Sequence, residues 1–154
     1  MDKNTITILI AVLESQMIFI RNITAKITER SVNLQPDDYI LMESIAYQIH
    51  NLYNATEDLL KIVAGYFENN IKESDQWHKL LLQRMSIDIP GIRPAFISSE
   101  THLLLNGLRG FRHFFRHSYG TFIEYHQLKA NLDKALNLSV YLDADIKQFI
   151  SHFF

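Results

Sequence analysis

The spacing of apolar residues predicts helices along the whole chain. Apolar positions recur three and four residues apart, and alternation typical of strands bounded by turns is hard to find. Only five glycines and three prolines interrupt the 154 residues. Five helical segments are expected: about 4–30, about 38 to between 67 and 70, 75–85, from 98 or 99 into the stretch 109–120, and about 124–153. The pattern therefore indicates an all-α fold, an up-and-down bundle of four to five helices.

Polar residues at the predicted helix starts support these boundaries. Their side chains can accept hydrogen bonds from the free backbone amides of a first turn. The candidate caps are Asp37 or Asp38 for the second helix, Ser74 or Asp75 for the third, and Ser98 or Ser99 for the fourth. Between the third and fourth helices, "IDIPGIRPAFISS" contains Pro90, Gly91 and Pro94 and is therefore predicted to be a turn-rich connector.

The first helix carries apolar residues on every side. They are Ile6, Ile8, Leu9, Ile10, Val12, Leu13, Met17, Ile18, Phe19 and Ile20. Such a helix must be covered on more than one face, either by a central position in the bundle or by a partner copy. We predict a homodimer. The apolar run "ITILIAVL" is shorter than a membrane span and no cleavage site follows it, so we expect a core helix and no membrane contact.

Length and composition limit the other possibilities. The chain suits one compact domain over residues 1–154, and 47% hydrophobic residues favour a folded protein. The absence of cysteine excludes disulfides, thiolate catalysis and cysteine-ligated metals, and fits a cytoplasmic protein. Because the net charge is −2, any polyanionic partner must be bound by a local basic patch.

Residues 109–120, RGFRHFFRHSYG, form such a patch. On an ideal helix with Arg109 at zero, the apolar residues lie between about 140° and 260° and are predicted to be buried: Phe114, Phe111, Leu104, Phe115 and Leu108. The cations form one strip between about 300° and 40°: Arg112, Arg116, Arg109 and His113. His117 lies near 80°, at the margin of this strip.

A strip of like charges is destabilising unless solvent or an anion lies against it. A solvated helix face is one interpretation. The other is chemical, because arginine matches phosphate geometry and histidine titrates near neutral pH. Metal-free RNA cleavage needs a base, an acid and cations beside the phosphate. Arg112 and His117 are about 140° apart, so either the helix deforms near Gly120 or two protomers share the site.

Other polar residues have competing interpretations. Spacing of four between His113 and His117 is typical of zinc ligands, but Arg116 lies between them and no glutamate base is present, so no metal or cofactor is expected. Trp77 and His78 lie in an apolar turn, which favours packing over catalysis. Glu57 and Asp58 are either partners of the arginine strip or exposed acids, and Arg93 is either a cap or an extension of the patch.

The segment from Arg112 to Tyr119 resembles the HEPN superfamily signature, an arginine, a polar residue and a histidine four to six positions later. It is similar to the HepT toxins, which have four intervening residues and a tyrosine two positions after the histidine. The segments "YNATEDLLKIV", "WHKLLLQRM", "IPGIRPAFIS" and "LRGFRHFFRHSYG" occur in HepT-like order, so the resemblance covers roughly residues 40–153.

The resemblance implies a dimeric helical bundle with Arg112 and His117 of both protomers in a shared cleft. It implies a metal-independent endoribonuclease toxin paired with a minimal, MntA-like nucleotidyltransferase antitoxin, in a homodimer that can assemble further with it. The antitoxin would transfer AMP from ATP to Tyr119, adding charge and bulk beside the arginines. We expect His117 in acid-base work with His113 assisting, and phosphate bound by Arg112 with Arg109 and Arg116.

Two alternatives remain open at this point. The first is a non-catalytic HEPN bundle that binds a nucleotidyltransferase and presents the same strip to nucleotide or RNA phosphate. The second is a plain helical scaffold, in which Tyr119 is an aromatic residue packed at a helix end. A nucleotidyltransferase in the neighbouring reading frame would argue against the scaffold.

Overall fold

The computed structural model describes residues 1–68, 76–117 and 122–154, which form five helices and contain no strand. The helices are α1 (Lys3–Ser31), α2 (Tyr39–Phe67), α3 (Trp77–Met85), α4 (Ser99–His117) and α5 (Tyr125–Ser151). The all-α prediction is therefore confirmed, with boundaries close to those expected. The predicted caps of the third helix, Ser74 and Asp75, lie outside the described residues, as does Tyr119.

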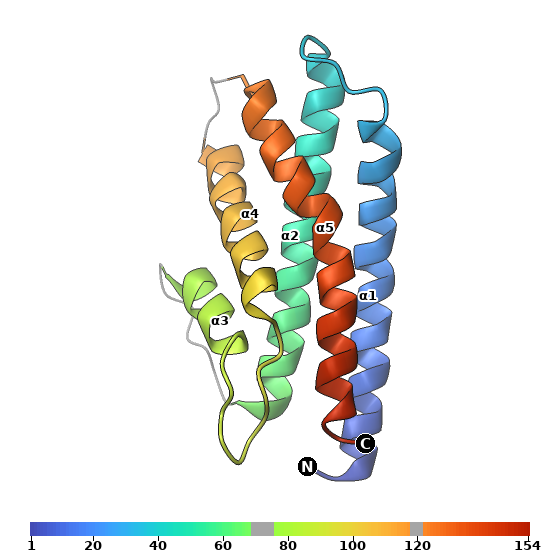
Figure 1. The fold of residues 1–154 in the computed structure, drawn as a ribbon, viewed down its shortest axis with the longest axis vertical. Helices are drawn as coiled ribbons and strands as arrows, with labels where there is room; N and C mark the ends of the chain where they lie inside the picture. The colour runs from blue at the N-terminus through green and yellow to red at the C-terminus, as the bar shows by residue number, and fades with distance from the viewer. Residues whose placement is uncertain (69–75, 118–121) are drawn as a thin grey trace.

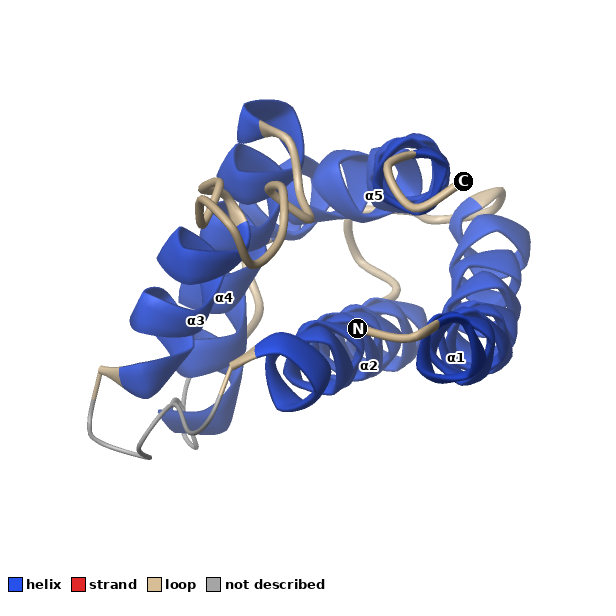
Figure 2. Cartoon of the chain, turned by 90° about the horizontal axis from the view of Figure 1, so that it is seen from below, coloured by secondary structure: helices blue, strands red, loops and turns tan. Residues whose placement is uncertain are grey.

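The four long helices run up and down beside one another (Figure 1). The two termini lie at the same end, because α1 and α4 run in one direction and α2 and α5 in the other (Figure 1). Seen from below, α1, α2, α4 and α5 surround the core, and the short α3 lies at one corner (Figure 2). This α3 helix contacts only α2 and α4 among the described elements. The up-and-down bundle is thus confirmed, and the homodimer stays a prediction.

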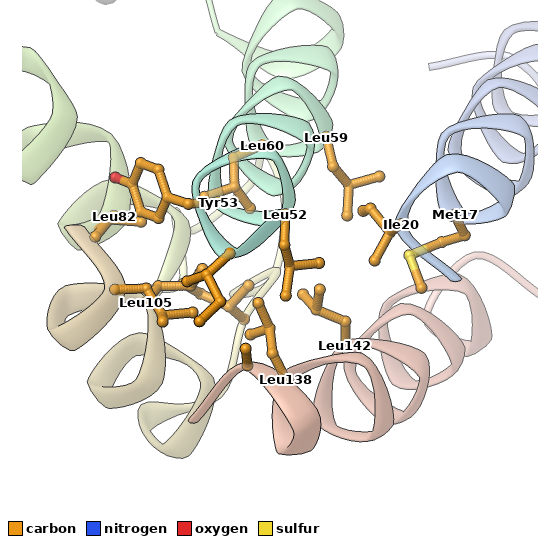
Figure 3. Close-up of a cluster of buried hydrophobic side chains, with 14 of the residues drawn as sticks. Met17, Ile20, Leu52, Tyr53, Leu59, Leu60, Leu82, Leu105, Leu138 and Leu142 are labelled. Atoms are coloured by element: carbon orange, nitrogen blue, oxygen red, sulfur yellow. The ribbon is translucent and has the colours of Figure 1, made fainter. Parts of the chain in front are cut away.

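The core is built from all five helices, as the close-up in Figure 3 shows. Its labelled side chains are at most 1% exposed: Met17, Ile20, Leu52, Tyr53, Leu59, Leu60, Leu82, Leu105, Leu138 and Leu142. Each fully buried leucine or isoleucine contributes roughly 1.5–3 kcal/mol to folding. Tyr53 projects from α2 toward the side where Leu82 of α3 lies (Figure 3). Helix α4, which carries the basic residues after Leu105, therefore packs on a continuous apolar core.

Helix α1 is not central in the bundle, so that explanation of its apolar surface is wrong. It packs against α2 and α5 through a single buried face that includes Leu13 and Ile20. Ile8, Ile18 and Phe19 are 56%, 56% and 60% exposed. By length and composition alone, α1 is the one described helix that could cross a membrane. Its buried face is that of a core helix, as predicted, and its outer face is open in this chain.

Two polar residues fix where α2 and α4 begin. The Asp38 carboxylate accepts a hydrogen bond from the Leu41 amide at 3.1 Å, which decides between the two predicted caps of α2. The Ser98 hydroxyl accepts one from the Thr101 amide at 3.2 Å, so Ser98 caps α4. The Asp145 carboxylate of α5 accepts hydrogen bonds from both Ser98 and Thr101. The start of α4 is therefore tied to α5, which sets the position of the residues further along it.

Arg93 closes the connector between α3 and α4. Its side chain is fully buried and donates from Nη2 to Glu68 Oε1 at 2.9 Å. The same guanidinium donates to the backbone carbonyls of Arg84, Ile87 and Pro94. Arg93 therefore satisfies carbonyls of the connector and of the end of α3, and it does not belong to the basic patch. This decides between the two roles that its sequence context allowed.

Candidate functional site

The end of α4 separates into an inner apolar face and an outer basic one, largely as the helical wheel predicts. Leu108 is fully buried and Phe111 is 3% exposed, and Phe115 is half-buried against the core. Phe114 is the exception, because it is half-exposed and does not pack against the core. At about 140° it lies at the margin of the predicted face, where the neighbouring helices no longer cover it.

A pocket lies between α3 and the basic face of α4. Its volume is about 290 Å³ and its lining residues are Gln76, His78, Lys79, Arg109, Arg112 and His113. Three residues of the predicted site, Arg109, Arg112 and His113, therefore meet in one place. Arg116 and His117 are exposed and do not line the pocket. The short α3 helix contributes the opposite wall, which adds a histidine and a lysine that the sequence did not assign to the site.

Arg112 is held in place by residues of α2. Its Nε donates to Asn54 Oδ1 at 2.8 Å, and its guanidinium carbon lies 5.9 Å from the centre of the Tyr53 ring. The Asn54 amide in turn lies 3.1 Å from His50 Nε2. Among the described residues, neither terminal nitrogen of Arg112 has a hydrogen-bond partner. A fixed guanidinium with two free nitrogens is suited to bind a phosphate through both of them.

His50 completes this arrangement. Burial, and then the positive charges of Arg112 and Arg116, lower the pKa of His50 below its ordinary value. The imidazole is therefore neutral at neutral pH, and its Nε2 can accept a hydrogen bond from the Asn54 Nδ2 group. With Nδ2 directed at His50, the Oδ1 atom of Asn54 faces Arg112. Because Arg112 Nε can only donate, it fixes the direction of the amide, and the neutral histidine accepts from the opposite side.

Glu57 binds the histidine of α3 rather than the arginine strip. Its Oε2 lies 2.7 Å from His78 Nδ1, and its side chain is only 5% exposed against 25% for His78. Glu57 is thus neither an exposed acid nor a partner of the arginines, whereas Asp58 is an exposed acid beside Lys61. Trp77 packs against the core, as predicted. His78 also reaches the pocket, which the sequence pattern did not indicate.

The carboxylate of Glu57 also acts on Tyr53. Burial first, and then the negative charge of Glu57, raise the pKa of the Tyr53 hydroxyl far above its usual range. The phenol therefore remains protonated at every physiological pH and adds no charge beside Arg112. Among the described residues, the charged groups at the pocket are one buried carboxylate and several cations, which favours an anionic ligand.

A family model described as HepT-like protein matches residues 44–153, well over half of the chain. The chain belongs to the HepT-like family. This confirms the resemblance drawn from the motif and its flanking segments. The matched range contains every residue of the pocket, and the whole of α1 precedes it. No curated protein and no solved structure matches the chain significantly. Family membership indicates a HEPN toxin of a toxin-antitoxin pair.

In this HepT-like protein the motif histidine stands apart from the motif arginine. Arg112 faces α2, whereas His117 is exposed, with its ring centre 4.6 Å from that of His113 one turn earlier. Helix α4 continues as far as His117, so no deformation up to that residue brings the two together. Any change near Gly120 lies outside the described residues. A site shared by two protomers therefore stays a prediction.

Proposed function

We propose that this HepT-like protein is a metal-independent endoribonuclease, the toxin of a toxin-antitoxin pair, that acts in the cytoplasm. The observation that carries the proposal is the convergence of Arg109, Arg112 and His113 on one pocket, with Arg112 fixed by Asn54. Fixed cations beside an imidazole suit a phosphodiester because they stabilise the charge that develops during its cleavage. Family membership supports the toxin assignment and a partner in general.

The proposed reaction uses the ribose 2′-hydroxyl as the nucleophile. A base removes its proton, the 2′-oxygen attacks phosphorus, the bond to the 5′-oxygen breaks, and an acid protonates that oxygen. Arg112 binds the phosphate, and Arg109 and Arg116 extend the positive surface along the RNA. We assign acid-base work to His117 with assistance from His113, whose ring lies beside it.

We further propose that the enzyme works as a homodimer. Arg112 and His117 point to different sides of α4 in one chain, so a second copy would supply the missing half of each site. Exposed Ile8, Ile18 and Phe19 on α1 offer a separate apolar contact surface, because α1 does not contact α4 in the described part of the chain. The dimer can assemble further with the antitoxin.

Neutralisation is proposed to occur at Tyr119 through an MntA-like nucleotidyltransferase. AMP on this hydroxyl, two positions after His117, would place a phosphate and a nucleoside near the arginines and compete with RNA. The expected product is a toxin whose intact mass increases by one AMP group. Tyr119→Phe would keep its ribonuclease activity and escape neutralisation.

The test is expression of the wild type, Arg112→Ala and His117→Ala in bacteria, each with and without the nucleotidyltransferase. We expect the wild type alone to degrade RNA and stop growth, and both variants to be harmless. When the purified proteins are incubated with RNA and a chelator, the wild type should cleave the RNA and the two variants should not. Equal RNA integrity with all three proteins would contradict the ribonuclease assignment.

The alternative is a non-catalytic HEPN bundle that binds the nucleotidyltransferase and nucleotide or RNA phosphate. The exposed position of His117 outside the pocket favours this alternative, because binding needs the arginines but no precisely placed acid. It predicts RNA binding that is lost in Arg112→Ala and retained in His117→Ala, with no cleavage by any of them.

A further inference from the structure

We propose that His78 is a second acid-base residue of the site, positioned by Glu57, and that it removes the proton of the ribose 2′-hydroxyl. The inference rests on the ribonuclease function proposed above and names a residue outside the motif. It also changes what the site requires, because a single chain then supplies both proton-transfer groups.

The contact between Glu57 and His78 determines which ring nitrogen is free. A carboxylate only accepts hydrogen bonds, so at 2.7 Å the His78 Nδ1 group is the donor. In the neutral ring this leaves the lone pair on Nε2, the state required of a base. A buried carboxylate that fixes an imidazole in this way also stabilises the imidazolium formed when the ring takes up a proton. Glu57 is 4% exposed, so water competes little for this contact.

The pocket places His78 opposite the phosphate-binding side chains. His78 and Lys79 line it from α3, and Arg109, Arg112 and His113 line it from α4. The two helices contact each other and both pack on α2, so the two walls are fixed relative to one another. The volume of about 290 Å³ is near the lower end of small-molecule sites, which suits part of a nucleotide such as ribose and phosphate.

Two imidazoles on opposite walls meet the need for one base and one acid. His78 Nε2 takes the 2′-hydroxyl proton while the 2′-oxygen bonds to phosphorus. The phosphorus bond to the 5′-oxygen breaks, and that oxygen takes a proton from the imidazolium of His113 or of the adjacent His117. The products are a 2′,3′-cyclic phosphate and a 5′-hydroxyl, and the two histidines exchange roles if water later opens the ring.

The groups that face His78 set the expected pH dependence. They are Glu57 of α2, Lys79 of α3, and Arg109, Arg112 and His113 of α4. Removing the carboxylate charge in Glu57→Gln leaves cations as the charged groups around the ring within the described part of the chain, which disfavours its protonation. Since a base must be unprotonated, the rising limb of the pH profile of kcat should move to lower pH in this variant. A purely structural role for Glu57 would not move that limb.

The decisive variant is His78→Asn, whose side-chain amide can still donate to Glu57. We expect kcat for an RNA oligonucleotide to fall by at least about 100-fold. Affinity for the same oligonucleotide with a 2′-deoxyribose at the cleavage position should stay within about 3-fold, because proton transfer is not needed for binding. Thermal unfolding reports whether the variant folds. The matched control is His152→Ala, an exposed histidine at the far end of α5, which should cleave like the wild type.

A second variant covers the case in which His78→Asn fails to fold. In His78→Gly, added imidazole can occupy the vacated space and should restore cleavage while binding of the deoxy analogue is unchanged. Cleavage at the wild-type rate by His78→Asn overturns the inference, as does a loss of cleavage fully matched by a loss of binding. Both outcomes leave the ribonuclease function intact if His117→Ala is inactive. RNA left intact by the wild type would instead overturn the proposed function itself.

Discussion

Arg93 and Arg112 lie in the same bundle, and their surroundings differ in one decisive way. Arg93 donates to a buried carboxylate and to three backbone carbonyls, and its side chain has no exposed surface. Arg112 is partly exposed and makes one hydrogen bond, from Nε to Asn54, among the described residues. Both arginines contact residues of or next to α2, yet only Arg112 lines the pocket between α3 and α4.

The difference separates an arginine that stabilises the fold from one that can bind a ligand. A guanidinium whose terminal nitrogens are bound by the protein cannot offer them to phosphate, and its loss removes a partner from a buried carboxylate. A guanidinium fixed through one nitrogen keeps its planar terminal pair for an anion and has already lost part of its conformational entropy. The guanidinium nitrogens that the protein already binds, rather than the residue type, therefore distinguish Arg93 from Arg112.

The largest expected effect is the loss of stability in Arg93→Ala. Among the described residues, the substitution leaves Glu68 with one remaining partner, Arg84 at 3.2 Å, and it removes donors from three carbonyls. We expect the free energy of unfolding to fall by about 3–5 kcal/mol, measured by urea denaturation. Arg21→Ala is the control, because its pair with Asp143 is exposed and should contribute no more than about 1 kcal/mol. An equal loss of unfolding free energy in both variants would contradict the structural role of Arg93.

Arg112→Lys should show the opposite profile, a large loss of function with little loss of stability. Lysine keeps the charge but lacks the planar fork and the Nε donor to Asn54. RNA cleavage should fall by about 100-fold, while the free energy of unfolding changes by no more than about 1.5 kcal/mol. Arg21→Lys on α1 serves as the matched control for both measurements. An unfolded Arg112→Lys would show that this arginine, too, is structural.

Lowering the pH should lower the free energy of unfolding through His50 of α2. Burial and the neighbouring Arg112 and Arg116 lower the pKa of this histidine in the folded state. At pH values below 6.5, His50 takes up a proton more readily in the unfolded chain than in the folded one, which lowers the free energy of unfolding. The contribution of neutral His50 to stability is therefore present above pH 6.5 and is lost as the pH falls through the folded-state pKa. Unfolding free energies at a series of pH values should therefore depend less on pH in His50→Gln.

Arg112→Ala provides an independent measurement of the same interaction. Removing its charge should raise the pKa of His50, without restoring it fully, because burial is the larger cause of the shift. Titration of the imidazole by NMR gives this value directly. An unchanged His50 pKa would mean that the positive charge of Arg112 does not affect protonation of the imidazole.

The smallest expected effect concerns two glycines of α4. A Cβ at Gly110 would have no neighbour within 4 Å, whereas one at Gly107 would lie 2.9 Å from Lys134 Cδ. Gly110→Ala should therefore raise the free energy of unfolding by about 0.5–1 kcal/mol, from helix propensity alone. Gly107→Ala should gain less, since the lysine side chain must move. Urea denaturation of both variants measures the difference, and a larger gain at Gly107 would contradict the packing around Lys134.

The bundle was predictable because helical periodicity, caps and breaks are local signals. The spacing of apolar residues gave five helices, and Asp38 and Ser98 were among the predicted caps. The basic strip was predictable for the same reason, since one helix determines which of its residues share a face. Phe114 departed from the wheel because burial at its margin depends on which neighbours are present.

The wall of the pocket opposite the motif was not predictable. His78 precedes Arg112 by more than thirty residues, and nothing in "WHKLLLQRM" distinguishes a packing histidine from one that faces a site. The signal that could have suggested it is a pairing between Glu57 and His78, which needs the packing of α3 on α2. Arg93 was undecided for a similar reason, because its partners come from four separate positions along the chain.

The sequence by itself determined the helices, the basic strip and the motif that relates this chain to the HepT-like family, because each depends on residues close together along the chain. Only the tertiary structure decided that Glu57 holds His78, that Arg93 binds Glu68 and backbone carbonyls, and that the terminal nitrogens of Arg112 have no partner among the described residues. These outcomes depend on which donors and acceptors the folded helices bring within about 3 Å, a distance that no local pattern specifies.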